Sequence, residues 1–327
     1  MRFRGRAGIP RPATFSNAAV PQARMVPQIT YPMFFYIVTP AYNALGWLQR
    51  CIRSVADQAG RGVQVHHHVQ DGGSADGTAA WLEQWRREHA DSPDYTFTYE
   101  SERDKGMYDA INRAWEKMPA GAAVTAHINA DEQYLPGALA GVSAAFSAQP
   151  QADIVLGTYV IVDNDQRYIC HRRPITPHRW TSATVCEIIT CSCFHRAESF
   201  RAHGIRFNTK YRALADVVFY REIVNHGQRY AVCPELLTTA FTVTGENLAW
   251  SETSRREWEE EQRLLPWYVT RRHGIAYRWC NLKRMLTDRR CIPPRSYSIF
   301  LGDSTARTVI TINHPTCRWG CRTVSED

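Results

Sequence analysis

The sequence contains no apolar run long enough to cross a membrane. The longest clear run is Met33 to Val38, whereas a membrane-spanning helix requires about 18 consecutive apolar residues. Residues 1–32 contain no acid, and they have neither the amphipathic helical spacing of a transit peptide nor the apolar core of a secretory signal. We therefore expect a protein that does not span a bilayer and that begins with a disordered basic arm over residues 1–32.

The sequence also has no Cys-x-x-Cys pair among its ten cysteines, and at 327 residues it is far longer than small secreted scaffolds that depend on disulfides. We expect reduced thiols in a cytoplasm. Cys191 and Cys193 lie in an apolar run, where a free cysteine behaves as a small hydrophobic residue.

Two groups of residues resemble transition-metal ligands, and neither makes a convincing site. His314, Cys317 and Cys321 supply only three zinc ligands at an uncommon spacing, so we favour the reading without zinc. In a strand containing His66, His67 and His68, only His66 and His68 share a face, so we expect these histidines to pack within a sheet.

Acidic residues are outnumbered by basic ones, which gives a formal net charge of +7. Such an excess favours anionic partners in general, including nucleotide phosphates, acidic lipids and nucleic acids. No aromatic and basic recognition motif accompanies the charge, so we do not expect a nucleic-acid partner.

Residues 271–295 interleave basic residues with Tyr277 and Trp279. This segment is either a surface for an anionic membrane or the solvated face of a C-terminal helix.

Short apolar runs of strand length alternate with helical stripes in the first half of the chain. Strands are predicted over residues 34–38, 63–71, 95–100 and 122–128, with amphipathic helices between them. This alternation predicts an α/β fold with a Rossmann-like, mostly parallel sheet flanked by helices.

The pattern changes after a predicted strand at residues 153–162. We expect a hairpin turn at residues 163–165, a further strand over 186–194 and a helix over 215–225. A charged helix follows, with Ser254 and Glu257 as a capping box and a break at Pro266.

Four polar segments follow apolar runs in a fixed order. They are Val38-Thr-Pro-Ala-Tyr-Asn43, Asp71-Gly-Gly-Ser-Ala-Asp-Gly-Thr78, Asp104-Lys-Gly-Met-Tyr-Asp-Ala-Ile-Asn112 and Ile128-Asn-Ala-Asp131. In open α/β sheets the carboxyl ends of parallel strands meet where ligands bind. Each segment alone has an ordinary reading as a turn, a charged helix start or a capped loop. The four together predict a nucleotide-sugar site.

The first two segments have groups suited to a nucleotide base. Thr39, Pro40, Tyr42 and Asn43 end the first predicted strand, where backbone groups and an aromatic ring can cradle a base. Asp71 ends the second strand on a Gly-Gly turn, and its carboxylate is suited to accept a hydrogen bond from a base N–H.

The last two segments have groups suited to ribose, phosphate and a metal ion. Asp104, Lys105 and Gly106 are expected to face ribose or phosphate, with Lys105 compensating charge. Asp131 is the strongest candidate ligand for Mg²⁺ or Mn²⁺, which take oxygen ligands and usually bind one or two protein carboxylates plus substrate phosphates.

With these motifs the chain resembles family 2 glycosyltransferases of the GT-A type, especially the non-processive bacterial enzymes of cell-surface polysaccharide biosynthesis. The similarity is strong from Phe34 to Gly137 and weaker to Arg263. It implies a GT-A domain over residues 33–245, with a nucleotide-binding half at 33–137 and an acceptor half at 138–245. Residues 246–327 would form a helical C-terminal extension.

The resemblance also implies roles for particular residues. The third segment resembles the donor-binding helix start of the family, which implicates Asp104, Gly106, Asp109 and Asn112. Asn129-Ala-Asp131 stands in place of the Asp-x-Asp metal motif, with asparagine at its first position and Glu132 following it.

The family is inverting, which implies a general base for the acceptor hydroxyl. Asp216 lies in a segment that resembles the one carrying this base, and its alternative reading is a carboxylate favoured by a helix dipole. Residues 244–247 resemble a loop near the donor phosphates or the acceptor.

We therefore predict a metal-dependent, inverting glycosyltransferase at the inner face of the cell membrane. It would move a sugar from a UDP- or GDP-sugar to a glycan or lipid-linked acceptor. The alternative is a non-catalytic nucleotide- or glycan-binding protein with a degenerate site. A sugar nucleotidyltransferase is disfavoured because no glycine-rich phosphate loop followed by lysine is present.

Overall fold

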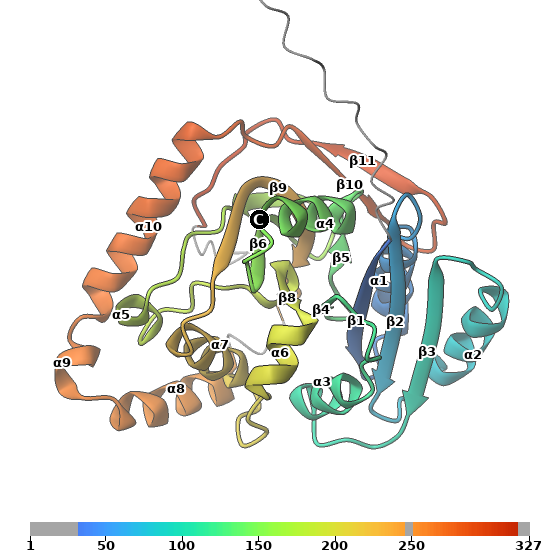
Figure 1. Cartoon of the computed structure of the whole chain (residues 1–327), viewed down its shortest axis with the longest axis horizontal. Helices are drawn as coiled ribbons and strands as arrows, with labels where there is room; N and C mark the ends of the chain where they lie inside the picture. Colours follow the sequence, from blue (N-terminus) through green and yellow to red (C-terminus); the bar gives the residue numbers. More distant parts are fainter. Residues whose placement is uncertain (1–31, 246–250, 320–327) are drawn as a thin grey trace, which may run out of the picture. The chain divides into compact units, whose positions relative to one another are not determined.

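The computed structural model describes residues 32–245 and 251–319 (Figure 1). The predicted basic arm, apart from Pro32, lies outside the described residues. So do Cys321 and the last two residues of the predicted 244–247 loop.

The first half of the chain forms the parallel part of a large sheet. Strands β1 (Met33–Ala41), β2 (Val63–Asp71), β3 (Tyr95–Ser101) and β4 (Val124–His127) lie in the order β3-β2-β1-β4, and all three pairings are parallel. Helices α1 (Leu45–Ala56), α2 (Thr78–Glu88) and α3 (Met107–Glu116) make the crossovers that parallel strands require. The predicted α/β class and the predicted strands of this half are confirmed.

The sheet continues with strands of both directions. Beyond β4 come β8 (Cys193–Arg196), β6 (Ile154–Val162), β9 (Tyr230–Thr242) and β5 (Gln133–Tyr134), and β7 (Tyr168–Arg172) pairs with β6. β8 is antiparallel to both β4 and β6, whereas β6 and β9 are parallel. The predicted turn at residues 163–165 joins β6 to β7. Helices α4 (Ala138–Ala148), α5 (Arg179–Ser182), α6 (Ala197–His203) and α7 (Ala215–Asn225) complete this half.

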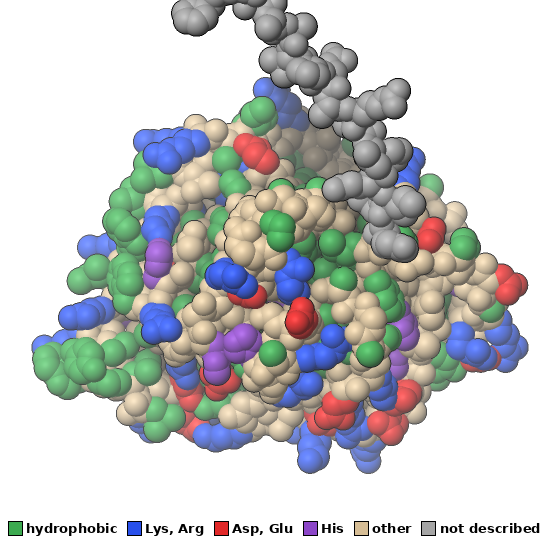
Figure 2. Space-filling model, viewed as in Figure 1, with side chains coloured by type: hydrophobic (Ala, Val, Ile, Leu, Met, Phe, Trp, Pro, Cys, Tyr) green, Lys and Arg blue, Asp and Glu red, His purple; other side chains and the backbone are tan. Residues whose placement is uncertain are grey.

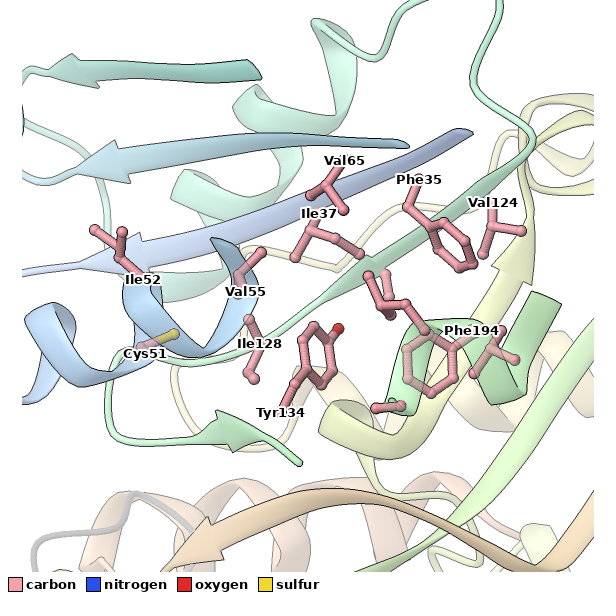
Figure 3. Close-up of a cluster of buried hydrophobic side chains, with 14 of the residues drawn as sticks. Phe35, Ile37, Cys51, Ile52, Val55, Val65, Val124, Ile128, Tyr134 and Phe194 are labelled. Atoms are coloured by element: carbon pink, nitrogen blue, oxygen red, sulfur yellow. The ribbon is translucent and has the colours of Figure 1, made fainter. Parts of the chain in front are cut away.

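Alternate side chains of β1 point to opposite faces of the sheet, and helices cover both faces. Phe35 and Ile37 are fully buried in a cluster with side chains of α1, α2 and α4, part of which Figure 3 shows. Tyr36 and Val38 are equally buried in a second cluster, with side chains of α3, α6 and α7. β1 is therefore the central strand between two apolar layers.

The three consecutive histidines pack within the sheet, as predicted. His67 Nε2 lies 2.9 Å from the Thr39 hydroxyl oxygen, and His66 and His68 both hydrogen-bond to Thr98. Burial lowers the pKa of His67 to about 3, so this ring is neutral at pH 7.

Two local predictions were wrong. The expected strand over residues 186–194 is mostly loop and a 3₁₀ turn (Thr190–Ser192), because an apolar run alone cannot distinguish a strand from a buried loop. The capping residue of α8 (Glu252–Leu264) is Ser251, whose hydroxyl accepts a hydrogen bond from Ser254 N at 3.1 Å. Glu257, the other member of the predicted capping box, has backbone partners elsewhere in the chain.

The C-terminal extension is helical only in its first part. α8 ends before Pro266, as predicted, and α9 (Trp267–Thr270) and α10 (His273–Arg290) follow it. The antiparallel strands β10 (Ser296–Phe300) and β11 (Arg307–Thr311) were not predicted. Gln133 and Phe300 exchange two hydrogen bonds, and Arg307 makes an ion pair with Asp57. The extension therefore packs directly on the domain.

Within the described ranges, no helix is both long and apolar enough to cross a bilayer. The nine cysteines in these ranges are free thiols. Most of them are buried, so they contribute to the apolar packing.

Candidate active site

A large open cleft lies at the carboxyl ends of β1, β2 and β4 and continues to α7 and α10. Its volume is about 1740 Å³. It brings together most of the predicted site residues, namely Pro40, Tyr42, Asn43, Asp104, Lys105, Gly106, Asp109, Asn129, Asp131 and Asp216. Thr39, Asp71 and Asn112 do not line it.

The loops after β1 and β2 are fastened to each other at one end of the cleft. Asn43 N donates to the Ser74 hydroxyl at 2.7 Å, and Asn43 Oδ1 accepts from Ala75 N at 2.9 Å. Asn43 has a φ of 47°, a left-handed conformation that asparagine tolerates better than most residues. Tyr42 beside it is 67 % exposed, so its ring is available for stacking.

Asp71 is fully buried and holds the turn after β2. Its carboxylate accepts hydrogen bonds from Ser74 N at 3.0 Å, the Ser74 hydroxyl at 2.5 Å and the Ser101 hydroxyl at 2.6 Å. The next residue, Gly72, does line the cleft, and a Cβ there would lie 2.8 Å from Asp104 Oδ2. Glycine thus allows the second and third segments to approach closely. A contact between Asp71 and a base stays a prediction.

Thr39 and Asn112 also have partners inside the protein. Thr39 is fully buried beside His67. Asn112 Nδ2 donates to Phe207 O at 2.8 Å, and Phe207 N donates to Asn112 Oδ1 at 3.0 Å. Asn112 therefore joins α3 to the chain before α7. The donor-binding roles predicted for both residues are untested.

The start of α3 places two carboxylates at the cleft. Asp104 Oδ1 accepts from Gly106 N at 2.7 Å, and burial raises the pKa of Asp104. Asp109 accepts from Lys105 N and makes an ion pair with Arg113 at 3.0 Å. The N-terminal end of this helix also carries the partial positive charge of the helix dipole.

The Asn129–Glu132 turn after β4 presents oxygen atoms suited to a hard divalent cation. Burial raises the pKa values of Asp131 and Glu132, and the charge of Asp131 raises that of Glu132 further. Glu132 Oε2 accepts from Asn129 N at 2.8 Å. Asn129 Oδ1 is buried without a hydrogen-bond partner among the described residues, whereas the Glu132 carboxylate interacts with Cys191 and Asn129.

This unpaired oxygen and the Asp131 carboxylate match the ligands that Mg²⁺ and Mn²⁺ prefer. The described part of the chain contains no cluster of three His, Cys, Asp or Glu residues able to hold a metal by itself. Mg²⁺ usually keeps several waters and binds one or two carboxylates plus substrate phosphates.

Asp216 reaches the same cleft from the first turn of α7. Its Oδ1 accepts from Val217 N at 2.8 Å. Burial raises the pKa of Asp216 to about 6, which is close to the value that suits a general base near neutral pH. The cleft thus contains one carboxylate suited to a metal and another suited to a proton.

Glu257 of α8 positions the segment that precedes Asp216, and sequence reasoning missed this role. Its carboxylate accepts from the backbone N–H groups of Arg212 at 2.7 Å, Ala213 at 3.0 Å and Leu214 at 2.9 Å. These contacts fix the N-terminal end of α7. The sequence signal for Glu257, three residues after a serine, suggested only a local cap.

A further wall of the cleft comes from segments without a recognisable motif. It includes residues 184–190, Arg172 at the end of β7, and Tyr277, Asn281 and Arg284 of α10. Contacts between elements distant in sequence create this wall, so periodicity and spacing carried no signal for it.

Residues 36–209, just over half of the chain, match the sequence profile of Glycosyl transferase family 2, and the chain therefore belongs to this family. Its fold is similar to that of GT-A structures. A 77-residue region is 38 % identical to an uncharacterized glycosyltransferase of Mycobacterium tuberculosis (strain ATCC 25618 / H37Rv), and it covers 24 % of this chain and 26 % of that protein.

Solved structures share the fold at low sequence identity. S. aureus TarS (residues 1–349) in complex with UDP-GlcNAc matches with a TM-score of 0.56 and 16 % identity, over 71 % of this chain and 65 % of that chain. The mannosyltransferase PcManGT from Pyrobaculum calidifontis, in complex with GDP-Man and Mn²⁺, matches with a TM-score of 0.54 and 18 % identity, over 79 % and 72 % of the two chains.

Proposed function

We propose that this enzyme moves a sugar, with inversion, from a UDP- or GDP-sugar to a glycan or lipid-linked acceptor in cell-surface polysaccharide biosynthesis. The observation that carries the proposal is the meeting of Asp131 and Asp216 in one cleft. Family membership supports the reaction class. The nucleotide sugars bound to TarS and PcManGT support the donor class.

The donor would lie along the loops after β1, β2 and β4. Tyr42 offers a face for the base, and the start of α3 offers N–H groups and Lys105 for ribose or phosphate. Asp131, with Asn129 Oδ1 beside it, would hold a divalent cation, and Mn²⁺ in PcManGT supports this assignment. When bound, such a cation neutralises charge that develops on the departing diphosphate.

The acceptor hydroxyl would lie next to Asp216. As its oxygen forms a bond to the anomeric carbon, the bond between that carbon and the diphosphate oxygen breaks on the opposite face. The acceptor proton passes to the Asp216 carboxylate, and the nucleoside diphosphate leaves with the bonding electron pair. Because Asp216 is partly buried in a cleft wall, its carboxylate is held in place for this transfer.

The first test is nucleotide release from UDP-, GDP- and dTDP-sugars, with and without Mn²⁺ or Mg²⁺. We expect metal-dependent release from one donor class, increased by an acceptor fraction from cell extract. Tight nucleotide binding without transfer to any fraction would instead favour the non-catalytic alternative.

The extension has an unusual exposed apolar stripe on α10, which supports contact with a membrane. Ile275, Trp279, Leu282 and Leu286 follow one another at helical spacing and are 65 %, 43 %, 47 % and 41 % exposed. The inward side of the same helix buries Ala276 and Cys280. Large apolar side chains in a row are costly to expose to water, so this stripe is suited to a partner.

Basic side chains flank this stripe and favour an anionic bilayer as the partner. In Figure 2, hydrophobic and basic side chains alternate on the side of the molecule where Figure 1 places α9 and α10. Trp267 is 68 % exposed beneath Arg271, and Lys283 lies over the Trp279 ring. The basic residues of this membrane-binding surface are Arg271, Arg272, Arg278, Lys283, Arg289 and Arg290. Aromatic and basic residues together suit the interface of an anionic membrane.

Removing the apolar stripe is expected to release the protein from vesicles. We expect the wild type to float with vesicles containing phosphatidylglycerol and not with pure phosphatidylcholine. The double variant Trp279→Ser/Leu282→Ser should bind at least about tenfold more weakly, because each buried apolar side chain contributes about 1.5–3 kcal/mol.

Val309→Ser is the matched control, because Val309 is 69 % exposed on β11, outside the membrane-binding surface. Equal flotation of the double variant and the wild type would rule out this surface as the membrane contact.

A further inference from the structure

Two arginines meet in the wall of the cleft. Arg172 ends β7 and pairs in register with Tyr159 of β6, while Arg284 is on the inward side of α10 and is only 9 % exposed. Burial raises the pKa of Tyr159 and both guanidinium groups lower it, so both charges lie near its hydroxyl. All three residues line the cleft.

Neither arginine forms an ion pair with a carboxylate of residues 32–245 or 251–319. Arg172 Nη1 donates to Cys317 O at 3.2 Å, and Arg284 Nη2 donates to Glu187 O at 3.4 Å. Arg172 Nε is buried and has no partner in these ranges. Each guanidinium has five N–H donors, and the described residues use one donor of each in a hydrogen bond.

Two other arginines with little exposure do have a carboxylate partner. The side chain of Arg173, next to Arg172 in sequence, is 2 % exposed and binds Asp288 at 3.0 Å. Arg221 pairs with Glu261 in the same manner. Two neighbouring positive charges without a counter-ion are costly to bury. Among the described residues, the carboxylate charge of Glu187 acts on Arg284, but Glu187 forms no ion pair with it. An anion bound in the cleft would offset the remaining positive charge of the pair.

The arginine pair lies on the Asp216 side of the cleft. Arg284 Nη2 donates to Glu187 O at 3.4 Å. Glu187 lines a small pocket together with Val217, the residue that follows Asp216. Arg172 and Arg284 come from β7 and α10, elements that follow the four predicted donor segments in the chain.

We propose that Arg172 and Arg284 bind an anionic group of the acceptor, a phosphate or a carboxylate. This inference rests on the proposed glycosyl transfer and deepens it, because it assigns a charge to the acceptor. Paired guanidinium groups match the oxygens of such anions through two or more hydrogen bonds. A lipid-linked phosphate suits the geometry well, because the outward face of α10 carries the membrane-binding surface and its inward face carries Arg284.

The test is direct binding measured by calorimetry, with four soluble probes. Citronellyl phosphate carries a phosphate, octyl glucuronide a carboxylate and octyl glucoside no charge, while UDP reports the donor site. We expect Arg172→Gln and Arg284→Gln to weaken binding of one anionic probe at least tenfold, with the Kd for UDP changed less than twofold. Arg167→Gln is the matched control, since Arg167 is an exposed arginine of the same β6–β7 hairpin.

The probes separate the possible sources of the anion. If the variants lose affinity for citronellyl phosphate alone, the anionic group is a phosphate. If they lose affinity for octyl glucuronide alone, it is a carboxylate. A parallel loss of UDP affinity would assign the arginines to the donor diphosphate and overturn the proposal. So would failure of the wild type to bind either anionic probe, or equal binding by wild type and variants.

Folding of the variants is checked by thermal unfolding. If Arg284→Gln does not fold, Arg284→Lys, which retains the positive charge, is used in its place. We expect Arg284→Lys to recover part of the anionic-probe affinity, and no recovery in a folded protein would overturn the proposal. Failure of the wild type to bind UDP would contradict the proposed function itself. The anionic probes do not test donor binding, so the two failures can be distinguished.

Discussion

Replacing Asp216 with asparagine is expected to reduce sugar transfer by about 10²- to 10⁴-fold, the usual contribution of a general base. Asparagine keeps the size of the side chain and cannot accept the acceptor proton. The Kd for the donor nucleotide should change less than twofold, because Asp216 belongs to α7 and not to the donor loops.

The pH dependence gives this prediction a specific signature. Burial raises the pKa of Asp216 to about 6, so its basic form predominates above that pH. We expect kcat/KM of the wild type to fall about tenfold per pH unit below 6, as expected when a single essential base is protonated. The asparagine variant should lose this dependence.

Thermal unfolding separates a catalytic role from a structural one. The pKa of Asp216 is raised in the folded state, so its ionised form costs stability above pH 6. The asparagine variant should therefore be at least as stable as the wild type at pH 7. Glu198→Gln is the control, because Glu198 is an exposed carboxylate in the first turn of α6, outside the cleft. Loss of donor binding or a large fall in Tm in Asp216→Asn would indicate a structural role.

Replacing Asp131 with asparagine is expected to remove metal-dependent turnover, with a loss of at least about 10²-fold, comparable to removing a principal source of charge stabilisation. Asp131 is the carboxylate of this turn that lines the cleft, whereas Glu132 is buried and does not line it. In the wild type, Mn²⁺ together with UDP should raise the Tm, and this increase should disappear in the variant.

The chain itself offers the matched comparison for Asp131. Asn129→Asp restores a second carboxylate at the first position of the motif, so we expect it to tighten Mn²⁺ binding. Because burial raises the pKa of Asp131, metal affinity should increase with pH as its proton is released. Unchanged turnover and unchanged metal dependence in Asp131→Asn would refute the metal assignment.

Much of the first half of the chain could be predicted because its signals are local. Val63, Val65 and Val69 indicate β2, and the strand ends at Asp71 as predicted. Helix α7 has its predicted limits because its apolar spacing and the following Gly227 act over one or two turns. Parallel strands bring their carboxyl ends together, so motif order alone predicted one shared cleft.

The prediction failed where the outcome depended on packing between distant elements. The sequence could not show that the Asp71 carboxylate accepts hydrogen bonds inside the protein, because one of the donors, Ser101, comes from a different strand. Residues 186–194 were predicted as strand, yet residues 186–190 form part of the cleft wall. Glu257 reaches the backbone of residues 212–214 only because α8 lies against the start of α7.

The sequence by itself determined the βαβ pattern, the order of the polar segments and the basic, aromatic-containing character of residues 271–295. These features follow from hydrophobic periodicity and turn chemistry, which act within a few residues. Only the tertiary structure decided that α10 turns Arg284 inward to meet Arg172 and leaves Leu282 in solvent. That choice depends on which face of the helix the rest of the protein can cover, and periodicity carries no information about it.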